Sequence, residues 1–89
     1  MRAQIIIEGK VQGVGFRDFA RRKATELKIK GFVRNVDLDK IEVVAEGDEK
    51  NLKTFVAQCK KGPLLAFVKK FEINSSTEEK EFVDFFIKY

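Results

Sequence analysis

The fold is decided by residues 2–27, RAQIIIEGKVQGVGFRDFARRKATEL, where a strand pattern, a glycine-containing loop and a helix pattern follow one another. Residues 2–8 are rich in β-branched side chains and predict a strand that Gly9 closes. Apolar residues then repeat at spacings of four, four and three, which places them on one helical face: Phe16, Ala20, Ala24 and Leu27. The stretch therefore predicts a strand, a loop and an amphipathic helix.

Two more strands are predicted directly after this helix. Gly31 is expected to end the helix, and residues 32–36 predict the second strand. Residues 40–46 predict a third strand, which follows a tight polar turn at residues 37–39. One face of the third strand is expected to be buried and the other partly exposed, the exposed face carrying Glu42, Val44 and Glu46.

The second half of the chain predicts one helix and two strands. Asp48 is a favourable N-cap, and Gly62-Pro63 ends the helical pattern. Residues 65–73 and 81–88 predict the fourth and fifth strands. The helical pattern between Asp48 and Gly62 has apolar residues at i, i+3, i+4 and i+7: Leu52, Phe55, Val56 and Cys59.

This order of elements is βαββαβ with one extra strand. It is typical of a ferredoxin-like α+β sandwich, an antiparallel sheet with two helices on one face, here with an additional C-terminal strand. A chain of 89 residues has room for one hydrophobic core, so residues 1–89 are expected to form a single domain.

The composition excludes several classes of chemistry. The chain contains no histidine and one cysteine, Cys59, which excludes Ser/His and Cys/His triads and zinc chemistry. Cys59 is interpreted as a core residue, because it lies on the apolar face of the second helix. The sequence has no apolar run of membrane-spanning length and no signal-peptide pattern, so a cytoplasmic location without membrane association is expected.

The loop after the first strand is the candidate for binding an anion. Gly13 and Gly15 permit positive φ, so successive backbone N–H groups can point inward at the start of a helix, next to the guanidinium of Arg17. A Walker A loop is excluded because no Ser or Thr follows, and a dinucleotide loop because Asp18 stands at its third glycine position. The alternative is a simple turn with Arg17 in solvent.

Charge and topology favour an anionic ligand. Residues 17–30 contain six basic and two acidic residues, a local charge of 6 − 2 = +4 that equals the net charge of the chain. Asn35 is a second candidate, because the first two strands of this topology run parallel and end at the same rim of the sheet. The alternative for Asn35 is that it only begins the hairpin turn.

Two separate motifs resemble those of the acylphosphatase family. Val11-Gln-Gly-Val-Gly-Phe-Arg17 is similar to its phosphate loop, and Gly31-Phe-Val-Arg-Asn35 to its second-strand motif. Shorter matches recur in register over nearly the whole chain: Glu42-Val, Glu46-Gly47, Gly62-Pro63, and Ala66 with Val68.

The resemblance implies a ferredoxin-like fold and hydrolysis of acyl phosphates to a carboxylate and inorganic phosphate, with neither metal nor cofactor. Asn35 would orient the attacking water. Inorganic phosphate is expected as product and inhibitor, and a monomer is expected. Phosphate would be bound by the side chain of Arg17 and by a loop of six residues: Gln12, Gly13, Val14, Gly15, Phe16 and Arg17.

The chain departs from the family pattern at several positions. Phe32 stands where many members have Trp, and Lys28 replaces a common helix-ending Gly. The usual Asp-Gly of the hairpin is Leu38-Asp39, so a non-glycine residue is expected to carry any positive φ there, at a cost of about 1 kcal/mol. Resemblance to some members suggests that the terminal carboxylate of Tyr89 reaches Arg17.

The alternative functions are non-catalytic. Ferredoxin-like sheets can bind RNA, but RNA-binding sheets carry aromatic residues in their central strands. The central strands of this chain carry aliphatic residues instead: Ile5, Ile7, Ile41 and Val43. No nucleic acid is therefore expected. A phosphate- or anion-binding module without turnover is opposed by the presence of both Arg17 and Asn35. A module of a larger maturation enzyme is opposed by the length of the chain.

Overall fold

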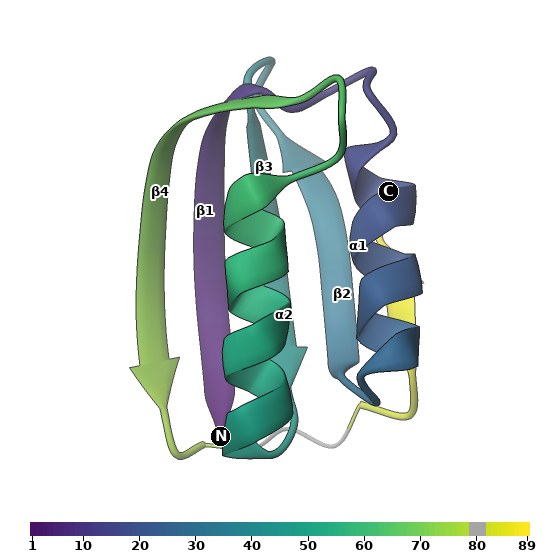
Figure 1. Cartoon of the computed structure of the whole chain (residues 1–89), viewed down its shortest axis with the longest axis vertical. Coiled ribbons are helices and arrows are strands. Elements are labelled where there is room, and N and C mark those ends of the chain that lie inside the picture. Colours follow the sequence, from purple (N-terminus) through teal and green to yellow (C-terminus); the bar gives the residue numbers. More distant parts are fainter. Residues whose placement is uncertain (79–81) are drawn as a thin grey trace.

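The computed structural model describes residues 1–78 and 82–89 (Figure 1). Its elements, in chain order, are β1 (Arg2–Lys10), α1 (Phe16–Glu26), β2 (Lys30–Val36), β3 (Lys40–Glu46), α2 (Glu49–Lys61), β4 (Phe67–Ser76) and β5 (Phe85–Ile87). The predicted order of elements is confirmed. The predicted fifth strand, residues 81–88, is shorter than expected, because β5 begins at Phe85 and ends at Ile87; its predicted first residue, Glu81, lies outside the described residues.

The five strands form one sheet in the order β4-β1-β3-β2-β5, and both helices cover the same face (Figure 1). β1 pairs antiparallel with β3 and β4, and β2 pairs antiparallel with β3, as the ferredoxin-like prediction requires. The extra strand β5 instead pairs parallel with β2, so the complete sheet is mixed. Because β1 and β2 are both antiparallel to β3, they run parallel and end at the same rim.

The hydrophobic core lies between the helices and one face of the sheet. It contains the odd-numbered residues of the central strands and the apolar faces of both helices. Cys59 is a fully buried member of this core, and burial raises the pKa of its thiol to about 12. The burial of Cys59 confirms the prediction that it is a core residue.

The other face of β3 is more buried than predicted. Glu42, Val44 and Glu46 are all buried, with Glu42 only 8% exposed. β3 is the middle strand, so side chains from both neighbouring strands cover it. The Nε2 of Gln4 on β1 donates to Glu42 at 2.7 Å, and the Nε of Arg34 on β2 donates to it at 2.6 Å. The predicted alternation of side chains between the two faces of β3 is confirmed, but the expected partial exposure of the second face is wrong.

The first helix ends earlier than predicted. α1 stops at Glu26, and Lys28 then takes a left-handed conformation with φ of 57°. Gly31 lies inside β2, where an added Cβ would overlap the carbonyl oxygen of Val44 on β3. Gly31 is therefore required by close strand packing and does not end the helix.

The later boundaries also shift. Asp37 carries the positive φ of the hairpin, 55°, so the expectation of a non-glycine residue in this conformation is confirmed. A turn in which the N–H of Ala66 donates to the carbonyl of Pro63 delays β4 to Phe67. β4 then continues to Ser76 because it pairs with β1 as far as Arg2. Among the described residues, no helix is long and apolar enough to cross a membrane.

Candidate active site

The loop between β1 and α1 leads directly into the helix. Gly13 and Gly15 have φ of 73° and 78°, the left-handed conformation that the sequence predicted for them. Gly15 is the N-cap of α1, and among the described residues no side chain caps this helix. The backbone N–H groups of the first helical turn have no acceptor within the helix, so they can bind an anion.

Two hydrophobic residues anchor this loop. Phe16, the first residue of α1, is fully buried, and its ring packs edge-on against Phe19 with centroids 5.9 Å apart. Val14 packs against the core from within the loop and is partly buried. The side chains of both residues therefore fix the loop, while Gly13 and Gly15 beside them leave the backbone accessible.

The loop borders a pocket of about 400 Å³ at the rim where β1 and β2 end. The pocket brings together Arg17, Asn35 and the glycine loop. Of the predicted site residues, all except Val14 line it. The complete lining is Val11, Gln12, Gly13, Gly15, Phe16, Arg17, Asp18, Arg21, Asn35, Ile87 and Tyr89.

Asn35 reaches the pocket from β2. It is exposed, and it lies on the same face of the strand as the buried Val33, at the end opposite Gly31. It pairs with Ile41 on β3. The prediction that the parallel course of the first two strands places Asn35 beside the glycine loop is confirmed.

Arg17 contacts the aromatic ring of Tyr89. Its guanidinium carbon lies 5.1 Å from the ring centroid, within the range of a cation–π contact. Among the described residues, Arg17 forms no ion pair, including with the terminal carboxylate of Tyr89. The contact expected from the carboxylate is therefore made by the ring, and the charge of Arg17 is free to meet an anion.

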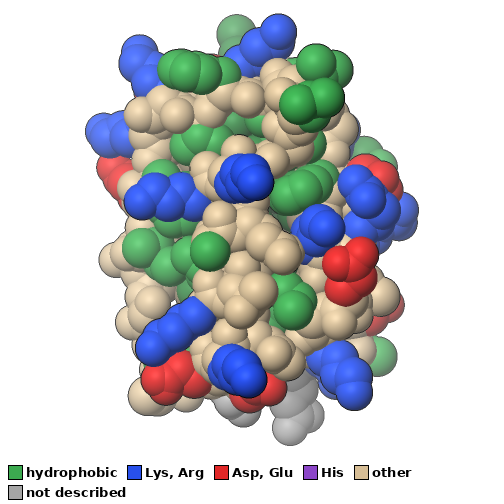
Figure 2. Space-filling model, in the orientation of Figure 1, with side chains coloured by type: hydrophobic (Ala, Val, Ile, Leu, Met, Phe, Trp, Pro, Cys, Tyr) green, Lys and Arg blue, Asp and Glu red, His purple; other side chains and the backbone are tan. Residues whose placement is uncertain are grey.

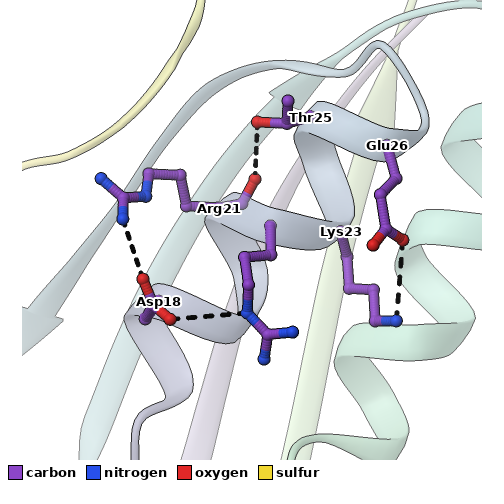
Figure 3. Close-up of polar contacts among 6 residues, drawn as sticks. Asp18, Arg21, Lys23, Thr25 and Glu26 are labelled. Atoms are coloured by element: carbon purple, nitrogen blue, oxygen red, sulfur yellow. Dashed lines mark hydrogen bonds and ion pairs between the residues drawn. The ribbon is translucent and has the colours of Figure 1, made fainter.

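The neighbouring charges on α1 neutralise one another (Figure 3). The carboxylate of Asp18 lies 2.9 Å from Nη2 of Arg21 and 3.4 Å from Nε of Arg22. One turn further on, Nζ of Lys23 lies 3.6 Å from Glu26. Among the side chains of the pocket lining, two arginines, Arg17 and Arg21, accompany one aspartate, and Arg17 is outside these ion pairs.

The helix-bearing face as a whole is mixed in charge. Figure 2 shows Lys and Arg side chains of the described residues separated by acidic and apolar ones, without a continuous basic stretch. On the face shown, the basic side chains therefore do not form a broad basic surface.

Sequence reasoning missed the structural contact of Gln12. Its side chain donates two hydrogen bonds to backbone carbonyls of the β2–β3 hairpin, at Asp37 and Lys40. The partners lie 25 and 28 residues away, and they are backbone atoms. No pattern of side-chain types in the sequence could have indicated this contact.

The described residues hold no group of three or more His, Cys, Asp or Glu side chains placed to bind a metal ion. Asp18 supplies the carboxylate of the pocket lining, and Arg21 and Arg22 already occupy its oxygens. The lining also contains the cationic side chains of Arg17 and Arg21 and the amide of Asn35.

Comparison with known proteins agrees with this geometry. The acylphosphatase family model matches residues 3–87. The chain belongs to the acylphosphatase family. It is 45% identical over 86 residues to the acylphosphatase of Thermotoga maritima, covering 97% of this chain and 94% of the relative. Membership in the acylphosphatase family identifies the chain as an enzyme.

Solved structures support the assignment to the acylphosphatase family. The crystal structure of acylphosphatase from Bacillus subtilis matches with a TM-score of 0.95 and 36% identity, covering 99% of this chain and 98% of the other. T. kodakarensis HypF matches with a TM-score of 0.85 and 31% identity, but the match covers all of this chain and 12% of HypF. A region similar to this chain therefore also occurs within a much longer protein.

Proposed function

We propose that the chain hydrolyses the carboxyl–phosphate bond of acyl phosphates to a carboxylate and inorganic phosphate in the pocket at the end of β1 and β2. The observation that carries the proposal is that one pocket is lined by the glycine loop, Arg17 and Asn35. Family membership supports the reaction class, and the pocket suggests which residues perform it.

Arg17 would hold the phosphoryl group and stabilise its charge. A guanidinium presents two parallel N–H donors that match two phosphoryl oxygens, and it stays charged at every physiological pH. Arg17 is half-buried, and no carboxylate among the described residues competes for it. Solvent therefore screens the charge of Arg17 less than it would screen the charge of a fully exposed side chain.

The loop amides would complete the phosphate site. Positive φ at Gly13 and Gly15 and the start of α1 supply backbone N–H donors to the remaining oxygens. These donors are held in place before the substrate binds, so no reorganisation is needed as charge develops. The residues proposed to bind through their backbone are Gln12, Gly13, Val14, Gly15, Phe16 and Arg17.

Asn35 would orient the attacking water. Its amide can both accept a hydrogen bond from water and donate one, and it lies across the pocket from the loop. The water oxygen attacks phosphorus, the bond from phosphorus to the acyl oxygen breaks, and a carboxylate leaves with its electron pair. The conjugate acid of that leaving group has a pKa of about 4, so no general acid is needed.

This chemistry requires neither a metal nor a cofactor. Phosphoryl transfer is catalysed mainly by positioning and by stabilising charge, and Arg17 with the loop amides supplies both. Inorganic phosphate, the product, carries the group that these residues bind. It is therefore expected to inhibit competitively.

Arginine substitutions on α1 test the role of Arg17. The Arg17→Ala variant is expected to lose detectable hydrolysis of benzoyl phosphate and to bind phosphate more weakly, because the charged fork is removed. Arg22→Ala is the matched control, since Arg22 lies on the same helix but does not line the pocket. Near-normal turnover in a folded Arg17→Ala variant would refute the site.

Asparagine substitutions on the sheet test the role of Asn35. Asn35→Ala is expected to lower kcat about 10²-fold while phosphate still binds, as for the loss of one preorganised polar group. Asn74→Ala on β4, outside this pocket, is the matched control. If phosphate affinity falls and turnover survives, Asn35 is a binding residue and does not orient water.

A further inference from the structure

The side chain of Gln12 joins the two halves of the pocket. Its Nε2 donates one hydrogen bond to the carbonyl oxygen of Asp37 at 2.7 Å and another to that of Lys40 at 2.9 Å. An amide nitrogen carries two hydrogens, so both donors of Gln12 are used, and both distances lie in the ordinary range. This pocket-lining side chain is therefore committed to the β2–β3 hairpin.

The location of this contact gives it a functional meaning. Gln12 immediately precedes Gly13 of the loop, and Asp37 lies two residues after Asn35. The loop follows β1, Asn35 lies on β2, and β3 separates these strands in the sheet. Both strands pair with β3, which places Asn35 opposite Ile41, and Gln12 adds a direct contact between the loop and the hairpin that follows Asn35.

We propose that Gln12 is a positioning residue for hydrolysis, which sets the location of Asn35 relative to the phosphate loop by holding the hairpin. The inference rests on the proposed function, because it assigns no chemistry of its own to Gln12. The backbone N–H of Gly9 also donates to the carbonyl of Asp39, at 2.9 Å. When Gln12 is replaced, the hairpin is therefore expected to stay attached through this bond and to shift in position.

The first test replaces the amide by an apolar chain of similar length. Gln12→Met is expected to lower kcat by about 10- to 100-fold, because small misplacements of a reacting group have effects of that order. The KM for benzoyl phosphate and the inhibition constant of inorganic phosphate are expected to stay within about threefold, since the loop amides and Arg17 remain.

Two further variants control for folding. Gln12→Asn keeps an amide on a chain one methylene shorter and is expected to retain part of the turnover. This variant tests the inference if Gln12→Met fails to fold. Gln4→Met removes another cross-strand amide hydrogen bond, to Glu42, away from the pocket, and is expected to leave kcat unchanged. Each kcat is expressed per mole of folded protein, determined by far-ultraviolet circular dichroism.

A double-mutant cycle separates positioning from a general structural effect. If Gln12 acts through Asn35, Gln12→Met is expected to lower kcat by less than about threefold in an Asn35→Ala background. Retention of its full effect there overturns the inference, as does a rise in the phosphate inhibition constant with unchanged kcat. If Asn35→Ala alone leaves kcat unchanged, the proposed role of Asn35 has failed, and the inference fails with it.

Discussion

Replacing Gly13 by alanine isolates the energetic role of the loop backbone. Gly13 has φ of 73°, and a Cβ added there meets no atom within 4 Å. The substitution therefore introduces no clash, and its cost is the left-handed conformation alone, about 1–2 kcal/mol for an L-residue. That free energy is expected to appear in one of two measurements.

The two measurements are the stability of the free protein and its affinity for phosphate. If the alanine stays left-handed without ligand, the cost lowers the free energy of unfolding, and the melting temperature falls by roughly 4–16 °C for a domain of this size. If the loop relaxes and must return on binding, phosphate affinity falls by about 5- to 30-fold. If the loop relaxes only in part, the same free-energy cost is divided between lower stability and weaker phosphate binding.

Urea unfolding and phosphate titration calorimetry on the Gly13→Ala variant measure both quantities. Gly31→Ala is the control with a packing cost, because its Cβ would overlap the Val44 carbonyl, and it is expected to lose far more stability than Gly13→Ala. A Gly13→Ala protein unchanged in both measurements contradicts the argument. So does a combined loss well above 2 kcal/mol, which would require a contact that the structure does not contain.

Three other predictions address charge and burial. Asp18→Asn is expected to tighten phosphate binding at low ionic strength and to lose this advantage in high salt, because it removes a negative charge from the pocket lining. Burial opposes ionisation of Glu42, but hydrogen bonds from Gln4 and Arg34 and the charge of Arg34 hold its pKa below the ordinary value of 4.5. The ionised carboxylate thus stabilises the fold above that value, and the stability advantage over Glu42→Gln should shrink as pH falls through the lowered pKa, as followed by urea unfolding; a constant difference would contradict this. Cys59 is expected to resist Ellman's reagent in the folded protein and to react on unfolding in urea, and rapid modification of folded protein would contradict its burial.

Local patterns in the sequence were sufficient to predict most of the fold. The strand at residues 2–8, the helical spacing of Phe16 and its neighbours, and the Asp48 cap each depend on residues close in sequence. The position of Asn35 beside the loop followed from topology, because parallel strands end at the same rim. Identification of the two motifs strengthened that prediction.

The remaining features depend on contacts between distant segments. The burial of Glu42 requires both neighbouring strands, and β5 pairs parallel with β2, a strand about 50 residues earlier in the chain. Gln12 binds backbone carbonyls, whose positions no residue type in the sequence encodes. In the sequence, Gly31 resembles a glycine that ends a helix. In the structure, its close approach to the carbonyl of Val44 explains why a glycine is needed there.

The most direct test of the account is the hydrolysis of benzoyl phosphate by the unmodified protein in excess EDTA, with inorganic phosphate as inhibitor. The account predicts rapid turnover that EDTA does not change and competitive inhibition by phosphate. Turnover that depends on an added metal, or phosphate binding without turnover, would contradict it.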